Sequence, residues 1–299
     1  KMKTYTVHEA IESFGFGRFQ FLMSAVTGFS WMADSMEIML LSLLSPSLVC
    51  EWGISSVEQA IGTTCVFAGW MIASPFWGWF CDRFGRKKGI FISSLMASTF
   101  GIGTAFAPTF PLFVVIRGVV GLALGGVTQS TTIYTEFLPT KHRANGVIML
   151  EILWSIGAAV EAIIALFIMP HWGWRGLVIC SSVPLLAFAF CCLWMPESAR
   201  YHISRNQKEA AVKVLSRVAA CNRKSLPEGE LVAEKNSDGE GETLCATPFA
   251  FFSGAIYLLL LIIIYFRMVN TFSYYGMSLY TTKLFQSTDV CHGGNPDNA

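Results

Sequence analysis

Long apolar runs alternate with short polar segments over most of the chain. A helix that crosses the hydrocarbon core of a bilayer needs about 20 apolar residues, and seven runs are near or above that length. Pro46 is expected to end the first run, and Pro139, Pro170 and Pro196 follow three later ones, because helices rarely continue past proline. The pattern therefore predicts seven membrane-spanning helices, at Phe21–Leu48, Val57–Phe80, Gly89–Ala107, Leu112–Phe137, Gly146–Met169, Gly176–Met195 and Phe251–Thr282.

Two polar segments outside these runs carry a helical pattern of their own. In the first, residues 6–15, the spacing predicts a helix at the membrane interface, with an apolar face made of Val7, Ala10, Ile11 and Phe14. In the second, the spacing predicts a short helix in a long loop, with an apolar face made of Ala211, Val214, Leu215 and Val218. The predicted order is an N-terminal segment, a six-helix bundle, a loop, a seventh helix and a tail, at residues 1–20, 21–195, 196–249, 250–283 and 284–299.

The composition also indicates a membrane protein. Charged residues make up 14% of the chain and hydrophobic residues 53%, whereas about 25% of a typical soluble protein is charged. The net charge of +1 gives no reason to expect a nucleic-acid partner, so the expected surroundings are the lipid bilayer. The nine cysteines form no CxxC pair and no zinc-like cluster, and neither a catalytic triad nor a nucleotide loop occurs. We therefore expect no metal, no cofactor and no enzymatic activity.

The positive charges lie mostly on one side of the predicted membrane. If the N-terminus is cytoplasmic, the cytoplasmic segments hold all of the 21 Lys and Arg residues except Arg117, Arg175, Arg267 and Lys283. Cytoplasmic loops of membrane proteins carry an excess of Lys and Arg. The sequence therefore predicts a multi-pass membrane protein with a cytoplasmic N-terminus.

The polar turn after the second run combines glycine, acidic and basic residues in a specific order, Gly-x-x-x-Asp-Arg-x-Gly-Arg-Lys, beginning at Gly78. It resembles the loop between helices 2 and 3 of the major facilitator superfamily of transporters. Three further segments resemble the same superfamily, and the last two of them resemble its sugar-porter branch. They are the glycines that follow Arg117, the turn Glu136–Arg143 and the segment Pro196–Arg200.

Other segments resemble one vesicle family of this superfamily, the synaptic vesicle two-related proteins: Phe14–Gln20, Trp31–Glu37, Cys50–Trp52 and Phe272–Gly276. The resemblance implies an all-α major facilitator fold of twelve helices, in a synaptic or secretory vesicle membrane or in the plasma membrane. This chain would hold the N-terminal six-helix half and helix 7. We therefore expect a fragment or a truncated product, whose partner is the missing C-terminal six-helix half or a full-length homologue.

Several ionisable residues fall inside the predicted spans, where even the lower scale assigns each a cost of ~2.5–3.5 kcal/mol at the bilayer centre. Four are candidates for proton coupling or an ion pair: Asp34, Glu37, Arg117 and Glu161. The resemblance implies that Asp34 faces Arg117 and carries a proton, because rocking of the helices changes the hydration of the carboxyl and its distance from the arginine. A static ion pair and a countercharge for a cationic solute remain alternatives.

Two further sets of residues are candidates for the transport machinery. The cytoplasmic turns would form a conformational gate, made of Gly78, Asp82, Arg83, Gly85, Arg86, Glu136, Arg143, Glu197 and Arg200. Within this set, Asp82 can accept from the start of a neighbouring helix or pair with an arginine. Polar and aromatic residues within the spans would line a substrate cavity, with helix packing or placement at the lipid interface as an alternative of at least equal weight for each residue taken alone: Trp31, Gln129, Tyr134, Trp154, Tyr274 and Tyr275.

Small residues and cysteines add two expectations about packing. Gly121 and Gly125 form a GxxxG face, which favours close helix packing. Cys50 and Cys291 both follow spans on the side opposite the basic loops, where disulfides persist. They can pair there, and two free thiols are the alternative.

These features predict secondary active transport of a small organic solute, either an organic ion or a sugar-like molecule, coupled to protons and working by alternating access. Two alternatives remain open: a membrane receptor or regulatory protein that binds without transport, and a non-functional truncated product. Uptake into proteoliposomes separates the first two, because a transporter accumulates solute and a receptor only binds it.

Overall fold

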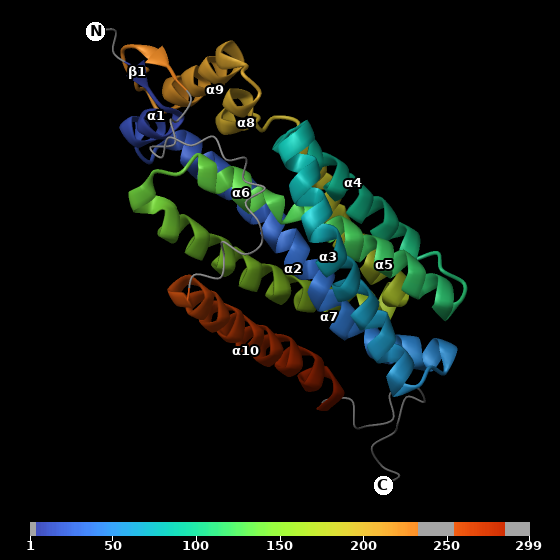
Figure 1. The fold of residues 1–299 in the computed structure, drawn as a ribbon. Coiled ribbons are helices and arrows are strands. Elements are labelled where there is room, and N and C mark those ends of the chain that lie inside the picture. The colour runs from blue at the N-terminus through green and yellow to red at the C-terminus, as the bar shows by residue number, and fades with distance from the viewer. Residues whose placement is uncertain (1–3, 233–253, 285–299) are drawn as a thin grey trace. The chain divides into compact units, whose positions relative to one another are not determined.

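A computed structural model of the chain describes residues 4–232 and 254–284 (Figure 1). Almost all of the described chain is helical, as the apolar runs predict. The elements in chain order are β1 (Thr4–Tyr5), α1 (Val7–Phe14), α2 (Arg18–Trp52), α3 (Ser56–Phe84), α4 (Arg86–Thr104), α5 (Phe110–Val127), α6 (Gln129–Glu136), α7 (Thr140–Cys192), α8 (Ala199–Ser204), α9 (Lys208–Cys221), β2 (Glu230–Leu231) and α10 (Gly254–Leu284).

Within the described residues, five helical segments are long and apolar enough to cross a membrane: Arg18–Trp52, Ser56–Phe84, Phe110–Glu136, Thr140–Cys192 and Leu258–Met277. The third of these joins α5 and α6. The fourth contains two of the predicted spans, because Gly173 has a non-helical backbone with φ of 63° that divides α7. The shorter α4 covers the remaining predicted span.

The chain divides into two compact units, residues 1–233 and 234–299, and α10 is the described helix of the second. In the first unit, α2 packs along α7, while α3 and α4 both pack along α5, and α4 also contacts α7 (Figure 1). We call the end of this bundle that holds α1, α8, α9 and the α3–α4 turn the basic end. The end that holds Gly53 and Gly173 is called the opposite end.

The contact between α3 and α5 depends on glycine. A methyl group on Gly125 would lie 3.2 Å from the backbone of Trp70 and Ser74, and one on Gly69 would lie 2.7 Å from the carbonyl oxygen of Gly118. One on Gly121 would overlap the backbone of Val66. The GxxxG face therefore brings two helix backbones into direct contact, as predicted.

The first spanning helix does not end at Pro46, so that prediction was wrong. α2 continues through Pro46 to Trp52 and ends at Gly53, whose left-handed backbone caps it. Membrane helices tolerate internal proline, because neighbouring groups satisfy the backbone atoms that it leaves free. α7 likewise contains Pro170 and Pro184.

At the basic end, the N-terminal segment folds onto the loop that follows the sixth span. The apolar face of α1, from Val7 to Phe14, is buried, and α1 packs on α9. β1 pairs in parallel with β2, and the side chain of Asn222 accepts from the backbone N–H of Phe19 at 2.9 Å. The apolar face of α1 is thus covered by protein, and its place at the membrane interface stays a prediction.

The opposite end is closed by aromatic packing. Trp52 packs edge-on against Phe110, Phe113 and Trp174, with ring centroids 5.6–5.9 Å apart. Beside this cluster, the guanidinium of Arg175 pairs with the carboxylate of Glu51 through bonds of 2.6 and 3.0 Å. Aromatic packing and the bidentate ion pair between Glu51 and Arg175 therefore stabilise this end.

Candidate functional site

One side of α2 carries a line of buried polar residues along most of its length. It includes Gln20, Ser24, Thr27, Ser30, Asp34, Ser35, Glu37 and Ser42. Polar groups out of contact with water need partners within the protein. The neighbouring helices α5 and α7 supply them.

Arg117 of α5 and Glu37 of α2 form an ion pair inside the bundle. Nη1 of Arg117 lies 2.8 Å from Oε2 of Glu37, and each side chain is only 1% exposed. The hydroxyl of Ser182, on the second part of α7, donates to Oε1 of Glu37 at 2.9 Å. Both oxygens of this carboxylate are therefore bonded, one to a charge and one to a hydroxyl.

Two more buried carboxyls lie beside this pair. Glu161, on the first part of α7, accepts from the hydroxyl of Ser181 at 2.5 Å and interacts electrostatically with Glu37 and Arg117. Asp34 is buried and interacts with Glu37. Within the described part of the chain, Oδ1 of Asp34, Oε2 of Glu161, and Nε and Nη2 of Arg117 have no hydrogen-bond partner. We call Asp34, Glu37, Arg117 and Glu161, with Ser181 and Ser182, the central cluster.

The structure pairs Arg117 with Glu37 and not with Asp34, which corrects the pairing that the resemblance implied. Asp34 and Glu37 share a helix face but are separated by three residues, or about 4.5 Å along the axis. α5 begins at the opposite end of the bundle, and Arg117 lies in its first half. Glu37 is the carboxyl nearer that end, so it is the one that pairs with the guanidinium.

The central cluster packs directly against Gly101 of α4, where a larger residue would not fit. A methyl group on Gly101 would lie 3.3 Å from Oε1 of Glu37 and would overlap the hydroxyl of Ser182. A methyl group on Gly103, two residues further along α4, would have no atom within 4 Å. Gly101 is therefore part of the site, although the sequence analysis did not select it.

The candidates for the cavity lining lie in three different settings. Trp31 donates to the hydroxyl of Thr131 at 2.6 Å, and its ring packs edge-on against Trp154, while Gln129 is half-buried at the start of α6. Tyr134 is fully buried, and its hydroxyl lies 2.5 Å from that of Ser24, so it packs α6 against α2. The last two candidates, Tyr274 and Tyr275, are in α10, with their rings 5.1 Å apart.

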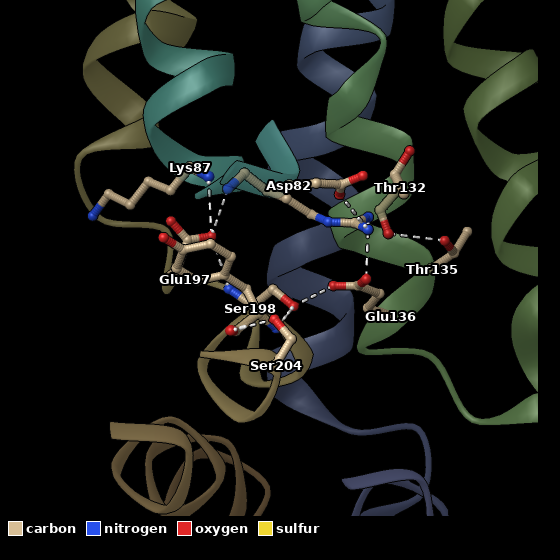
Figure 2. A network of polar contacts seen from close by, with 10 residues as sticks. Asp82, Lys87, Thr132, Thr135, Glu136, Glu197, Ser198 and Ser204 are labelled. Atoms are coloured by element: carbon tan, nitrogen blue, oxygen red, sulfur yellow. Dashed lines mark hydrogen bonds and ion pairs between the residues drawn. The ribbon is translucent and has the colours of Figure 1, made fainter. Parts of the chain in front are cut away.

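The gate candidates form a polar network at the basic end (Figure 2). Oε1 of Glu197 accepts from the backbone N–H groups of Arg86 at 2.9 Å and Lys87 at 3.1 Å, so this carboxylate caps the start of α4. Arg86 pairs with Glu136 at 3.1 Å, and Glu136 accepts in turn from the hydroxyl of Ser198. Side chains from three helix ends are thereby joined.

Two gate candidates differ in their surroundings. Asp82 pairs with Arg86 at 3.5 Å and is 71% exposed, so of its two predicted uses the structure has the ion pair, and Glu197 supplies the helix cap. Gly85 has φ of 108°, and a side chain there would overlap the carboxylate of Glu197.

The remaining gate candidates have smaller parts. The carbonyl oxygen of Arg83 accepts from Tyr201 of α8 and from Arg205, which follows that helix. Arg200 is exposed and interacts electrostatically with Glu136, and Arg143 interacts in the same way with Glu12. Gly78 has open space where a side chain would begin. The charged gate candidates that the network joins are thus Asp82, Arg86, Glu136 and Glu197.

The predicted disulfide stays a prediction. Cys50 is disulfide-bonded, and Cys291 lies outside the described residues.

Sequence reasoning missed Ser181, Ser182 and Glu51. The first two are adjacent hydroxyl residues in an otherwise apolar run, and that was the available signal. Glu51 pairs with Arg175, which the charge analysis noted only as one of few basic residues on its side.

Comparison with known proteins agrees with the motifs. Residues 11–292 match the family model described as sugar (and other) transporter. The svop-1 protein of Caenorhabditis elegans is 49% identical over 292 residues, covering 98% of this chain and 56% of that protein. The synaptic vesicle 2-related protein of Bos taurus is 46% identical over 289 residues, covering 96% and 52%. The chain thus spans about half the length of the curated relatives it matches.

A solved structure has the same fold. The xylose transporter XylE from E. coli, in a partially occluded inward open conformation, superposes with a TM-score of 0.61 at 20% identity, over 69% of this chain and 56% of that chain. These matches confirm the major facilitator fold and the resemblance to synaptic vesicle two-related proteins.

Proposed function

Because the chain belongs to the sugar (and other) transporter family of the major facilitator superfamily, we propose that it forms the first half of a proton-coupled secondary transporter for a small organic solute. The observation that carries the proposal is the central cluster. It places one arginine among three carboxyls within a membrane-spanning bundle. Buried ionisable residues in membrane helices mark ion and substrate pathways.

The charge balance of the cluster supports proton binding. Arg117 neutralises one carboxylate, Glu37, at 2.8 Å. If Asp34 and Glu161 were both ionised, two uncompensated negative charges would remain buried, and burial of an unpaired charge is very costly. Each of these two carboxyls also has an oxygen without a hydrogen-bond partner among the described residues. Protons are therefore the simplest ligands of Asp34 and Glu161.

Coupling then follows from movement of the helices. The cluster joins α2, α5 and both parts of α7, so a rocking motion that separates α2 from α7 would separate Glu37 from Ser182 and would change access of water to Asp34 and Glu161. Half-transporters of this superfamily are related by an axis along the membrane normal, with the substrate between them. Trp31, Gln129 and Trp154 are the candidates in this unit for the solute-facing surface.

The basic-end network would act as the gate in this cycle. Arg86, Glu136 and Glu197 hold the ends of α4, α6 and α8 together through contacts of 2.9–3.1 Å. We place this end on the cytoplasmic side of a vesicle membrane or of the plasma membrane, because most of the Lys and Arg residues lie there. Release of the network would open that side.

The test measures solute accumulation in proteoliposomes with an imposed proton gradient, using the chain joined to the second half of svop-1 and, in parallel, the chain alone. We expect gradient-driven uptake by the joined protein. Asp34→Asn and Glu161→Gln should abolish uphill uptake and keep part of the solute exchange. The matched control is Glu151→Gln, which removes an exposed carboxyl from the same helix as Glu161 and should keep both activities.

Three outcomes would contradict the proposal. Full gradient-driven uptake by both cluster variants would remove Asp34 and Glu161 from coupling. Saturable binding of a solute without uptake would favour the receptor. Uptake by the chain alone at the rate of the joined protein would show that the second half is dispensable.

A further inference from the structure

A cavity of about 480 Å³ lies at the basic end, outside the central cluster. It lies where three membrane helices end or begin, α3 at Phe84, α4 at Arg86 and α7 at Cys192. Its lining residues are Phe84, Lys87, Lys88, Phe91, Leu193, Glu197, Tyr201, His202 and Gln207. Neither transport nor gating, as described above, gives this cavity a role.

The lining has two chemically different parts. Phe84, Phe91 and Leu193 form an apolar part, and Phe84 and Leu193 are exposed. The other part carries basic and hydrogen-bonding groups, among them Lys88 and His202. The cavity therefore offers an apolar wall and a positive rim to the same occupant.

The rim keeps an excess of positive charge. Glu197 is its one acidic residue, and Oε1 of that carboxylate is taken by the backbone N–H groups of Arg86, Lys87 and Ser198. Lys87 uses one ammonium N–H for the carbonyl oxygen of Leu193 at 2.6 Å, which leaves two. Lys88 is exposed. Both lysines can therefore donate to an anion.

The depth of the cavity points to the headgroup region of the membrane. Trp79 of α3 and Trp194, just after α7, are 53% and 75% exposed and lie close in sequence to the lining residues Phe84 and Leu193. Exposed tryptophans are enriched at the membrane–water interface. The apolar wall would then meet acyl chains, and the basic rim would meet phosphates.

We propose that this cavity binds one anionic phospholipid of the cytoplasmic leaflet, with its phosphate at Lys87 and Lys88 and an acyl chain along Phe84, Phe91 and Leu193. Anionic lipids concentrate in that leaflet, and basic pockets between membrane helices bind their headgroups. A free phosphate would leave the apolar wall unused, which is why the lipid is the favoured source of the anion. The bound lipid would join α4 to α8 beside Glu197, the cap of α4.

The test measures lipid binding to the purified full chain in a neutral detergent by native mass spectrometry. The probes are dioleoyl phosphatidylserine and dioleoyl phosphatidylcholine, which share their acyl chains, and inorganic phosphate as a soluble competitor. The wild-type protein should bind one molecule of phosphatidylserine more tightly than one molecule of phosphatidylcholine. Lys88→Gln should weaken phosphatidylserine binding about five-fold, the usual contribution of one basic residue near a lipid surface.

Two further variants separate the parts of the site. Lys141→Gln removes an exposed lysine at the start of α7, outside the cavity, and should leave binding unchanged. Phe91→Ala should weaken binding of both lipids, because both use the apolar wall. His202→Gln gives a second rim variant, which should weaken phosphatidylserine binding only.

Several results would overturn the proposal. Equal binding of the two lipids by wild type would exclude recognition of charge. An equal loss in Lys141→Gln and Lys88→Gln would indicate general attraction to a basic surface. Displacement of phosphatidylserine by millimolar phosphate, with no effect of Phe91→Ala, would assign the rim to a soluble phosphate.

Discussion

Arg117 and Glu37 in the central cluster are each 1% exposed, whereas Asp82 in the basic-end network is 71% exposed. The central cluster is held together through side chains alone, each with few possible partners. At the basic end, by contrast, backbone N–H groups at the start of α4 share the carboxylate of Glu197. Loss of one side chain should therefore be severe in the centre, and graded at the basic end according to how many bonds the residue makes.

The largest effect is expected for Arg117→Met. It leaves Glu37 as a buried carboxylate without its countercharge, and breaking a buried pair in this way costs about 3–5 kcal/mol. Unfolding of the purified protein in mixed detergent and SDS measures the loss. The control is the double variant Glu37→Gln/Arg117→Met, which removes both charges and should recover at least half of it. An equal loss in the single and double variants would contradict a strong pair.

The next effect is expected for Gly101→Ala, compared with Gly103→Ala. Both changes favour the helix, by up to about 1 kcal/mol. Only the first pushes a methyl group into Ser182 and against Glu37, and overpacking of this kind costs about 1–3 kcal/mol. In the same unfolding assay, the Gly101→Ala protein should be less stable than the Gly103→Ala protein. The reverse order would show that α4 does not press on the cluster.

At the basic end, Glu197→Ala should lower the free energy of unfolding by about 1–2 kcal/mol, the usual effect of losing a helix cap. Amide hydrogen exchange should accelerate at Arg86 and Lys87, whose N–H groups lose their acceptor. Glu151→Ala, on an exposed face of α7, is the control and should leave both amides protected. Unchanged exchange in Glu197→Ala would mean that another group caps α4.

A smaller effect is expected for Asp82→Ala. Its ion pair with Arg86 is long, at 3.5 Å, and open to water, and exposed pairs contribute about 0–1 kcal/mol. Arg86 also keeps Glu136 as a partner. In the unfolding assay, the loss of stability caused by Asp82→Ala should be smaller than that caused by Glu197→Ala. A loss as large as that one would make Asp82 a structural residue of the gate.

The smallest effect concerns pH and the docking of α1. The hydroxyl and the backbone N–H of Thr140 both donate to Glu12 and lower the pKa of that carboxyl from its ordinary value of 4.5. A lowered pKa stabilises docking at pH above that ordinary value, and the contribution is lost as pH falls through the lowered one. Proteolysis of α1 should accelerate on acidification from about pH 6 to pH 3. Glu12→Gln should remove this dependence.

The helices and the charged residues of the central cluster could be predicted from the sequence, but its two serines and the pairing of partners within it could not. Arg117, Glu37 and Glu161 stand out because charge is rare in apolar runs. Whether Arg117 meets Asp34 or Glu37 depends on a difference of three residues along α2, about 4.5 Å. Apolar periodicity gives the face of a helix but not its position along a neighbouring helix, so it could not decide between them.

Two other features were hidden for related reasons. An amphipathic pattern shows that one face of α1 is covered, but lipid and α9 satisfy it equally well. The cap on α4 comes from Glu197, which follows Arg86 by 111 residues, so no local motif joins them. The sequence did mark Glu197 as part of a family signature, and the structure gives that signature a physical reason.

The contacts of β1 and Asn222 have a consequence for the order of synthesis. Thr4 pairs with Glu230, and the N–H of Phe19 is capped by Asn222, so both residues bind partners that the ribosome adds about 200 residues later. At about 5–20 residues per second, the ribosome needs roughly 10–40 s to make the intervening chain. During that time α2 must enter the bilayer with its N-terminal segment unpaired, and the emergence of α9 and β2 closes the unit.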